Sequence, residues 1–176
     1  MNKKDFSKTC LSQSLIELLR DKEYDEISIQ DIVDKAGFSR NTYYRNFNNI
    51  DEILDYYLDS YVDKFIADSK IHSLPVDSNE YFNVVTNHFT DSQTIKLYSL
   101  LIKRGLIDHI VKQFYNRFNK RLFPNQDSFF RLFTIGGFFS IYVEYLLNRL
   151  PMSKEEAYQK AIEFNNILKK ATLENN

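Results

Sequence analysis

The residues best suited to chemistry in this chain lie together in one short segment, SRNTYYRN, from Ser39 to Asn46. Arginine and asparagine form paired hydrogen bonds with the edges of guanine and adenine in the major groove of DNA. The hydroxyl groups of threonine and tyrosine commonly bind backbone phosphates. These residue types together on one short helix indicate contact with double-stranded DNA.

The local charge around this segment supports that interpretation. From Lys35 to Ile50 there are three cations and no acidic residue, whereas the first 71 residues carry ten Lys or Arg against fourteen Asp or Glu. The whole chain has a formal net charge of −1, so its total charge does not point to nucleic acid. A polyanion site must therefore be a small basic patch on an acidic domain.

Two short helices joined by a tight corner are expected to position the segment. Ser28 has the features of an N-cap, with Asp31 in the first turn, and Gly37 is expected to end that helix. Ser39 is expected to cap the next helix, which ends near residues 47–48. This is a helix-turn-helix, with a second helix thin enough for a major groove about 12 Å wide. The apolar side is predicted at Phe38, Tyr43 and Phe47, and the outer side at Arg40, Asn41, Thr42, Tyr44 and Arg45.

The alternative is a corner inside an ordinary helical bundle, and the polar outer side of the second helix argues against it. The composition, with only four Gly and three Pro in 176 residues, predicts an all-α chain of about nine helices. We expect these helices over 4–21, 29–36, 39–48, 50–68, 78–89, 92–104, 106–123, 128–150 and, after a Ser153–Glu156 capping box, the C-terminal segment. Ser78 and Ser92 are the expected N-caps of the fifth and sixth helices.

Several absences limit the classes of protein. No apolar run reaches the roughly 18 residues that span a bilayer, and polar residues interrupt any signal-like N-terminal segment. A single cysteine, Cys10, fits a reducing compartment. We therefore expect a cytoplasmic protein without membrane contact.

The stretch ISIQDIVDKAGFSRNTYYRNFNNIDEIL, residues 27–54, resembles the N-terminal domain of TetR/AcrR-type transcriptional regulators. The family pattern has Ser or Thr opening one helix, I-x-x-x-A-G ending it, S-x-x-T-[aromatic or Leu]-Y-x-x-F next, and then an acidic-apolar helix start. The counterparts are Ser28, Ile32, Ala36, Gly37, Ser39, Thr42, Tyr43, Tyr44, Phe47, Asp51 and Leu54. With the stretch IKLYSLLIKRGL, the chain is also similar to a subgroup of short regulators that includes those of dihydroxyacetone kinase genes.

The resemblance implies a TetR-like fold with a helix-turn-helix domain over 1–48 and a helical regulatory and dimerisation domain over 49–176, beginning with a connector helix at 50–68. It implies a ligand-responsive repressor that binds a pseudo-palindromic operator as a homodimer, with an unidentified small-molecule effector and no cofactor or metal. An activator of the same fold, or a helical adaptor that uses the helix-turn-helix for protein contacts, remains the alternative. The candidate DNA-binding residues are Ser28, Gln30, Ser39, Arg40, Asn41, Thr42, Tyr43, Tyr44, Arg45, Lys3, Lys4 and Lys8.

Two positions depart from the family pattern. Glu23 stands where a glycine is usual before the aromatic Tyr24, and Ile50 stands where a lysine often holds a phosphate. We expect the lysines near the N-terminus, Lys3, Lys4 and Lys8, to take over that phosphate contact.

The region after residue 48 holds twelve of the fifteen phenylalanines, which by itself predicts only an aromatic helical core. The resemblance implies a dimer through the last two helices, at Phe138, Ile141, Tyr145, Ala157, Ala161, Phe164 and Leu168, with packing inside one subunit as the alternative. It also implies a ligand pocket, for which the candidates are Tyr98, Arg104, Phe114, Phe118 and Phe133. Seven cations against one acid between Lys96 and Arg121 indicate a solvated face or, alternatively, a contact with an anionic effector.

An enzyme is the rival class. The three histidines, His72, His88 and His109, lie far apart in the sequence, and the chain has no H-E-x-x-H, G-x-S-x-G or P-loop motif. Cys10 lies in an amphipathic helix, where a small buried residue is expected rather than a nucleophile. The sequence therefore predicts a binding protein and not an enzyme.

Overall fold

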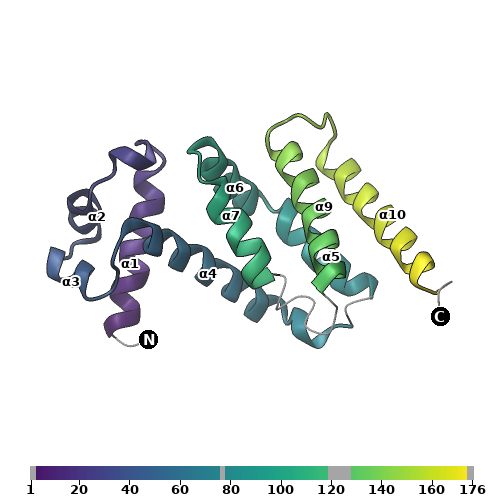
Figure 1. The fold of residues 1–176 in the computed structure, drawn as a ribbon, viewed down its shortest axis with the longest axis horizontal. Helices are drawn as coiled ribbons and strands as arrows, with labels where there is room; N and C mark the ends of the chain where they lie inside the picture. The colour runs from purple at the N-terminus through teal and green to yellow at the C-terminus, as the bar shows by residue number, and fades with distance from the viewer. Residues whose placement is uncertain (1–2, 76–77, 119–127, 174–176) are drawn as a thin grey trace. The chain divides into compact units, whose positions relative to one another are not determined.

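The computed structural model describes residues 3–75, 78–118 and 128–173. In these residues the chain is all-helical, with nine α-helices and no strand (Figure 1). This confirms the predicted all-α class and the predicted number of helices. None of the described helices is both long enough and apolar enough to cross a membrane.

The α-helices are α1 (Lys3–Leu18), α2 (Ile29–Ala36), α3 (Arg40–Tyr44), α4 (Ile50–Ser69), α5 (Asn79–Thr90), α6 (Ser92–Lys103), α7 (Ile107–Gln113), α9 (Ser128–Leu146) and α10 (Lys154–Leu173). Two short 3-10 turns, η1 (Tyr24–Glu26) and η2 (Ile71–Ser73), and a π-helical turn, η3 (Phe114–Phe118), complete the described elements.

Four helices end at least three residues earlier than predicted. α1 stops at Leu18 and α3 at Tyr44, each followed by turns. The helix expected over 106–123 is interrupted after Gln113, where the backbone widens into η3, and residues 119–123 lie outside the described part. α9 stops at Leu146 because Asn148 adopts the left-handed conformation, with φ of 53°.

The predicted caps account for most helix starts. Ser28 and Asp31 form a capping box, in which the Ser28 hydroxyl accepts a hydrogen bond from the Asp31 amide at 3.1 Å and the Asp31 carboxylate accepts one from the Ser28 amide at 2.8 Å. Gly37 ends α2 at φ of +71°, a left-handed conformation that favours glycine. The Ser78 cap and the Ser153–Glu156 capping box are likewise confirmed.

The expected cap of α6 is wrong by one residue. The side chain of Asp91, not Ser92, accepts the amides of Gln93 at 2.8 Å and Thr94 at 3.2 Å. An aspartate at this position also carries charge that suits the positive end of a helix dipole, so it replaces the serine as the first capping side chain.

The chain divides into two compact units. Unit 1 comprises residues 1–63 and 100–113, and unit 2 comprises residues 64–99 and 114–176. The helix-turn-helix domain predicted over 1–48 is the first part of unit 1, and the structure adds the start of α4 and the segment 100–113 to the same compact unit.

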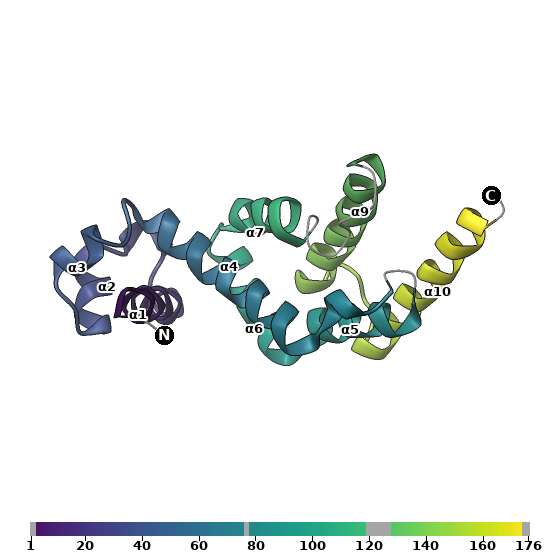
Figure 2. The same cartoon turned by 90° about the horizontal axis from the view of Figure 1, so that it is seen from below.

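Unit 1 has a continuous apolar core. α1 packs on α2 and α2 packs on α3, as Figures 1 and 2 show from two directions. Helical spacing places one apolar face of each helix toward this core. Its most deeply buried side chains include Leu11, Leu15 and Leu19, Ile32 and Val33, Tyr43, Ile53, Leu54, Leu58 and Val62, and Leu101 and Ile110 of the segment 100–113.

Unit 2 has an aromatic core. The Phe89 ring of α5 lies 5.3 Å from Phe114, 5.2 Å from Tyr142 and 6.1 Å from Phe138, measured between ring centroids. Tyr98 is fully buried beside them. Edge-to-face and tilted pairs of this kind add to the free energy gained by burying the rings.

Candidate nucleic-acid interface

The two faces of α3 differ as the sequence predicts. Tyr43 is fully buried and Phe47 is buried beside it, with ring centroids 6.5 Å apart. Tyr44 is 60% exposed, although it directly follows Tyr43. The residues that face solvent are Ser39, Arg40, Asn41, Tyr44 and Arg45, and Thr42 is half-buried.

Tyr43 does not belong among the candidate DNA contacts. Its side chain is completely covered by unit 1, so its ring cannot reach a groove or a phosphate in this conformation. Burial of the ring raises the pKa of the Tyr43 hydroxyl, with the nearby Tyr44 as a smaller cause. The role of Tyr43 is to hold α3 on the core.

Both candidate serines carry out capping. The Ser28 hydroxyl takes part in the capping box of α2, and the Ser39 hydroxyl accepts the Thr42 amide at 3.3 Å. Asn46, at the end of the segment, donates to the carbonyl of Thr42 at 2.7 Å and to the Ser7 hydroxyl of α1 at 3.0 Å. These bonds fix the position of α3 relative to α1, and phosphate contacts by the serines stay a prediction.

Arg40 is connected to α2 by a chain of hydrogen bonds. Its Nε donates to Oε1 of Gln30 at 2.6 Å, and Nε2 of Gln30 donates to Oδ1 of Asp34 at 2.6 Å. Arg40 and Asp34 are exposed and Gln30 is half-buried. An arginine, an amide and a carboxylate thus form one row across the outer surface of the two helices.

The N-terminal lysines have different surroundings. The Nζ atom of Lys8 lies 5.3 Å from the ring centroid of Phe47 and 5.1 Å from that of Tyr56, within the range of cation–π attraction. Lys3 and Lys4 are exposed. Lys8 therefore has a fixed place near the start of α4, whereas phosphate binding by any of the three stays a prediction.

A comparison with known families agrees with this geometry. Residues 14–57 match the family described as "Bacterial regulatory proteins, tetR family". These residues are therefore similar to the N-terminal domain of TetR-type regulators. The match begins within α1, covers α2 and α3, and ends within α4. It therefore contains the segment from Ser39 to Asn46 and most of the core that supports it. No match to a curated protein was found.

The match supports a DNA-binding transcription regulator with a helix-turn-helix. The narrower similarity to regulators of dihydroxyacetone kinase genes stays a prediction. The matched residues, 14–57, are about a quarter of the chain and lie wholly in unit 1, so the match describes no part of unit 2.

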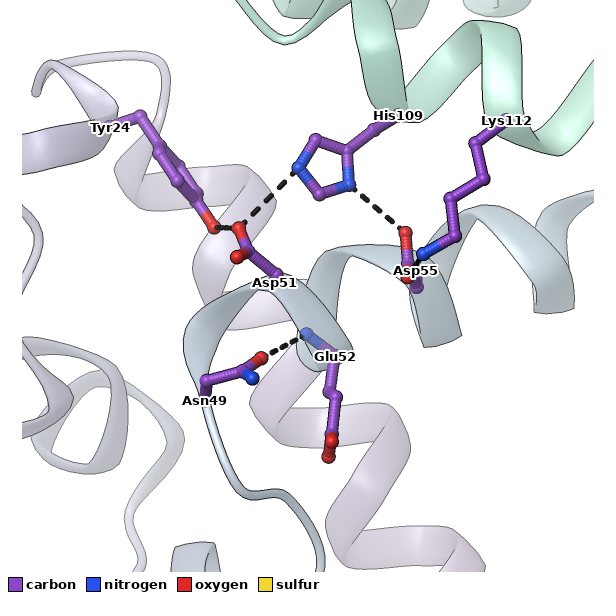
Figure 3. Close-up of polar contacts among 7 residues, drawn as sticks. All are labelled: Tyr24, Asn49, Asp51, Glu52, Asp55, His109 and Lys112. Atoms are coloured by element: carbon purple, nitrogen blue, oxygen red, sulfur yellow. Dashed lines mark hydrogen bonds and ion pairs between the residues drawn. The ribbon is translucent and has the colours of Figure 1, made fainter.

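Unit 1 also carries a polar cluster that the sequence did not predict (Figure 3). His109 of α7 lies between two carboxylates of α4, with Nδ1 at 3.0 Å from Asp55 and Nε2 at 3.4 Å from Asp51. Tyr24 of η1 donates to Asp51 at 2.5 Å, and Lys112 donates to Asp55 at 2.5 Å. We call these five residues the α4–α7 cluster.

The titration of this cluster follows from its contacts. Burial opposes ionisation of Asp55, but hydrogen bonds from Lys112 and His109 outweigh it and lower the pKa of this carboxyl group. Burial, followed by the hydrogen bond to Asp51, raises the pKa of the Tyr24 hydroxyl. Asp55 is therefore a carboxylate and Tyr24 a neutral donor at neutral pH, so the cluster attaches α7 and η1 to the start of α4.

Arg104 has a different place from the one predicted. Its Nε donates to the carbonyl of Leu19 at 2.7 Å and its Nη2 to the carbonyl of Arg20 at 3.0 Å, and its Nη1 pairs with Glu23. The side chain is 9% exposed. Arg104 thus satisfies carbonyl groups at the end of α1 within unit 1, and the prediction that it lines a ligand pocket is wrong.

Arg104 also explains the departure at Glu23. Glu23 has φ of −70°, so its position does not need a glycine, and its carboxylate is the partner of Arg104. Lys112 pairs with Asp55 in the same way. Two cations of the basic stretch 96–121, Arg104 and Lys112, thus form ion pairs within unit 1. No sequence spacing could reveal these pairs, because their members lie more than fifty residues apart.

The predicted residues of unit 2 have mixed outcomes. Tyr98 and Phe114 lie in the aromatic core, but Phe133 is 64% exposed and lines no interior. Of the predicted dimer residues, Ile141 and Phe164 are exposed, and Phe138, Tyr145 and Ala157 are half-buried. The side chains of Phe118, Ala161 and Leu168 lie outside the described part of the structure.

In the described residues, no three His, Cys, Asp or Glu side chains are grouped as a metal site would require. Cys10 is half-buried and makes no disulfide.

Proposed function

We propose that the chain is a ligand-responsive repressor that binds a pseudo-palindromic operator as a homodimer. The observation that supports DNA reading is the amphipathic arrangement of α3. Tyr43 and Phe47 hold one side of the helix in the core, while Arg40, Asn41 and Arg45 stand on the other side in water. Arginine and asparagine are the side chains that distinguish bases by paired hydrogen bonds.

The proposal of a homodimer is supported by the surface of unit 2. Large apolar side chains remain exposed on α9 and α10: Phe129, Leu132, Phe133, Ile141, Phe164 and Ile167. Exposed large apolar side chains in this number often mark an interface. A second copy of the chain is the occupant that two-fold operators require, because each subunit then reads one half-site.

The site predicts the form of the operator. Two reading helices related by a two-fold axis contact half-sites whose centres lie about one helical turn, roughly 34 Å, or a multiple of it, apart. An effector would act by shifting the population between two arrangements of the reading helices. Because its target is chromosomal DNA, we place the protein in the cytoplasm.

Selection from a random DNA library with the full-length purified chain tests this proposal. We expect enrichment of an inverted repeat and protection of both half-sites in a footprint. The variant with Arg40, Asn41 and Arg45 changed to alanine should remain folded, because these residues lie outside the buried core. It should enrich no sequence, because it lacks the side chains that we propose contact the bases. A wild-type chain that enriches no sequence would refute DNA reading and leave the helical adaptor as the better interpretation.

A further inference from the structure

Gln30 differs from the other candidate DNA-binding residues because it links an exposed arginine of α3 to a carboxylate of α2. Its Oε1 accepts from Arg40 and its Nε2 donates to Asp34, each at 2.6 Å. One donor and one acceptor site remain on the amide, but its orientation is already set by its two neighbours. Its contacts suggest an action on its neighbour Arg40.

The chemistry of the two neighbours determines the orientation of the Gln30 amide. A carboxylate only accepts hydrogen bonds, so Asp34 requires the NH₂ group of the amide. A guanidinium only donates, so Arg40 requires the carbonyl oxygen. Both requirements select the same orientation, and Asp34 thereby directs the Gln30 carbonyl toward Arg40.

The same bond restricts Arg40. An arginine has one N–H on Nε and four on its two Nη atoms. Gln30 occupies the Nε donor, and in the described part of the chain the Nη atoms of Arg40 donate to no protein acceptor. A guanidinium held in this way keeps its Nη edge for an outside partner, and guanine O6 and N7 accept two such donors side by side.

We propose that Gln30 is a positioning residue for base reading, which fixes the guanidinium plane of Arg40 and is itself fixed by Asp34. This inference rests on the proposed function, since it assigns a cause to the sequence preference of the same site. A long exposed arginine otherwise samples many rotamers, and its ordering on DNA costs affinity and selectivity. Preorganisation by Gln30 reduces that cost for the base pair that Arg40 contacts.

The proposal is tested with a double-mutant cycle on the operator selected by the wild-type chain. Arg40→Ala first identifies the base pair whose preference is lost. Gln30→Met keeps the size and helix propensity of residue 30 but removes both hydrogen bonds. We expect wild type to prefer its base by about 5- to 150-fold at this position, the range of a paired contact, and Gln30→Met to reduce that preference by roughly 3- to 10-fold.

Two further variants separate positioning from direct contact. In an Arg40→Ala background, Gln30→Met should change no base preference. The double variant Gln30→Glu with Asp34→Asn keeps the net charge. Its carboxylate at position 30 accepts from Arg40 Nε, and its amide at position 34 donates to that carboxylate, so it should recover most of the base preference. Gln13→Ala, at an exposed position of α1, should leave every preference unchanged.

Each outcome decides the matter. Full base preference in Gln30→Met, an undiminished effect of Gln30→Met without Arg40, or no effect of Arg40→Ala on any base would overturn the inference alone, with the proposed function intact. Wild-type chain without sequence preference would overturn both. Circular dichroism and thermal unfolding of each variant confirm that the chain remains folded.

Discussion

The two units differ in where their large apolar side chains lie. In the described residues of unit 1 only Phe6 and Tyr44 remain exposed among the large hydrophobic side chains, and both lie on the helix-turn-helix domain. In unit 2, six such side chains are exposed along α9 and α10. Unit 1 therefore buries most of its large apolar side chains with its own residues, whereas unit 2 leaves several of them uncovered on two helices.

The difference teaches how the two units use their polar groups. Unit 1 joins distant segments with polar side chains, such as Arg104 at the end of α1 and the α4–α7 cluster. Its outer surface is then available for a hydrophilic partner. Unit 2 relies on aromatic contacts, which continue onto its surface and favour an apolar partner. The predictions below test these two assignments.

The largest effect is expected from charges on the exposed surface of unit 2. The pair Ile141→Glu and Phe164→Glu places carboxylates where we propose the second copy, and burial of unpaired charge is strongly unfavourable. Sedimentation should show monomers, and operator affinity should fall by about 10²- to 10⁴-fold as bivalent binding is lost. Asn87→Glu, at an exposed site of α5, is the control, and an unchanged dimer in the double variant would move the interface elsewhere.

A matched pair of truncations compares the interior of unit 1 with the surface of unit 2. Leu54→Ala leaves a cavity at a fully buried position and should lower the free energy of unfolding by about 2–5 kcal/mol. Ile141→Ala, at a position 57% exposed, should cost less than about 0.5 kcal/mol in the monomer. Urea unfolding of both variants at low concentration makes the comparison, and equal losses would contradict the assignment of interior and surface.

Removal of Arg104 tests the attachment of segment 100–113 within unit 1. Arg104→Met keeps the aliphatic stem but leaves the carbonyls of Leu19 and Arg20 without their donor, at a cost of about 1–3 kcal/mol. Hydrogen exchange should become faster at the end of α1. Lys103→Met, at the neighbouring exposed residue, is the control. If both variants exchange alike, Arg104 does not stabilise that end of the helix.

The smallest effect near neutral pH concerns His88 in unit 2. Burial lowers the pKa of His88 to about 4, against the weaker opposing influence of Asp91, and its ring stacks on Phe65 with centroids 3.9 Å apart. The unfolded chain, with an ordinary histidine pKa near 6.5, binds the proton first. Stability from His88 is thus fully present above about pH 6.5 and is lost as pH falls toward 4, by roughly 0.8 kcal/mol at pH 6 and roughly 2 kcal/mol at pH 5.

His88→Gln should remove this part of the pH dependence, measured by urea unfolding at pH 7.5, 6 and 5. His72→Gln, at an exposed position of η2, is the matched control and should leave the pH dependence of stability unchanged. A wild-type chain whose stability stays constant between pH 7.5 and 5 would mean that His88 is not buried as a neutral ring.

The parts of the fold that depend on local signals could be predicted from the sequence. Ser28, Gly37, Ser39 and Ser78 mark helix ends because a side chain or a glycine bonds or bends within a few residues of its own position. The inward place of Tyr43 and Phe47 follows from helical spacing in the same way. The family pattern covers the same residues and indicates that this geometry serves DNA binding.

The contacts that join distant segments could not be predicted. Arg104 meets Leu19 across 85 residues and His109 meets Asp55 across 54 residues. Such pairs depend on how the chain returns to α1 and α4, which periodicity does not determine. The prediction of Arg104 as a pocket residue failed for this reason. The assignment of Tyr43 to DNA failed because it came from the family pattern, and the buried side chain cannot make that contact.

The central claim is that the exposed side of α3 reads DNA sequence. The most direct measurement is the affinity of the full-length chain for its selected operator relative to a scrambled duplex, at one fixed salt concentration, for wild type and Arg40→Ala. We predict a wild-type ratio of 10³ or more, and a loss of about 1–3 kcal/mol in Arg40→Ala on the operator alone. Equal weakening of both duplexes by Arg40→Ala would remove only Arg40 from the residues that read bases, whereas a wild-type ratio near one would contradict the claim.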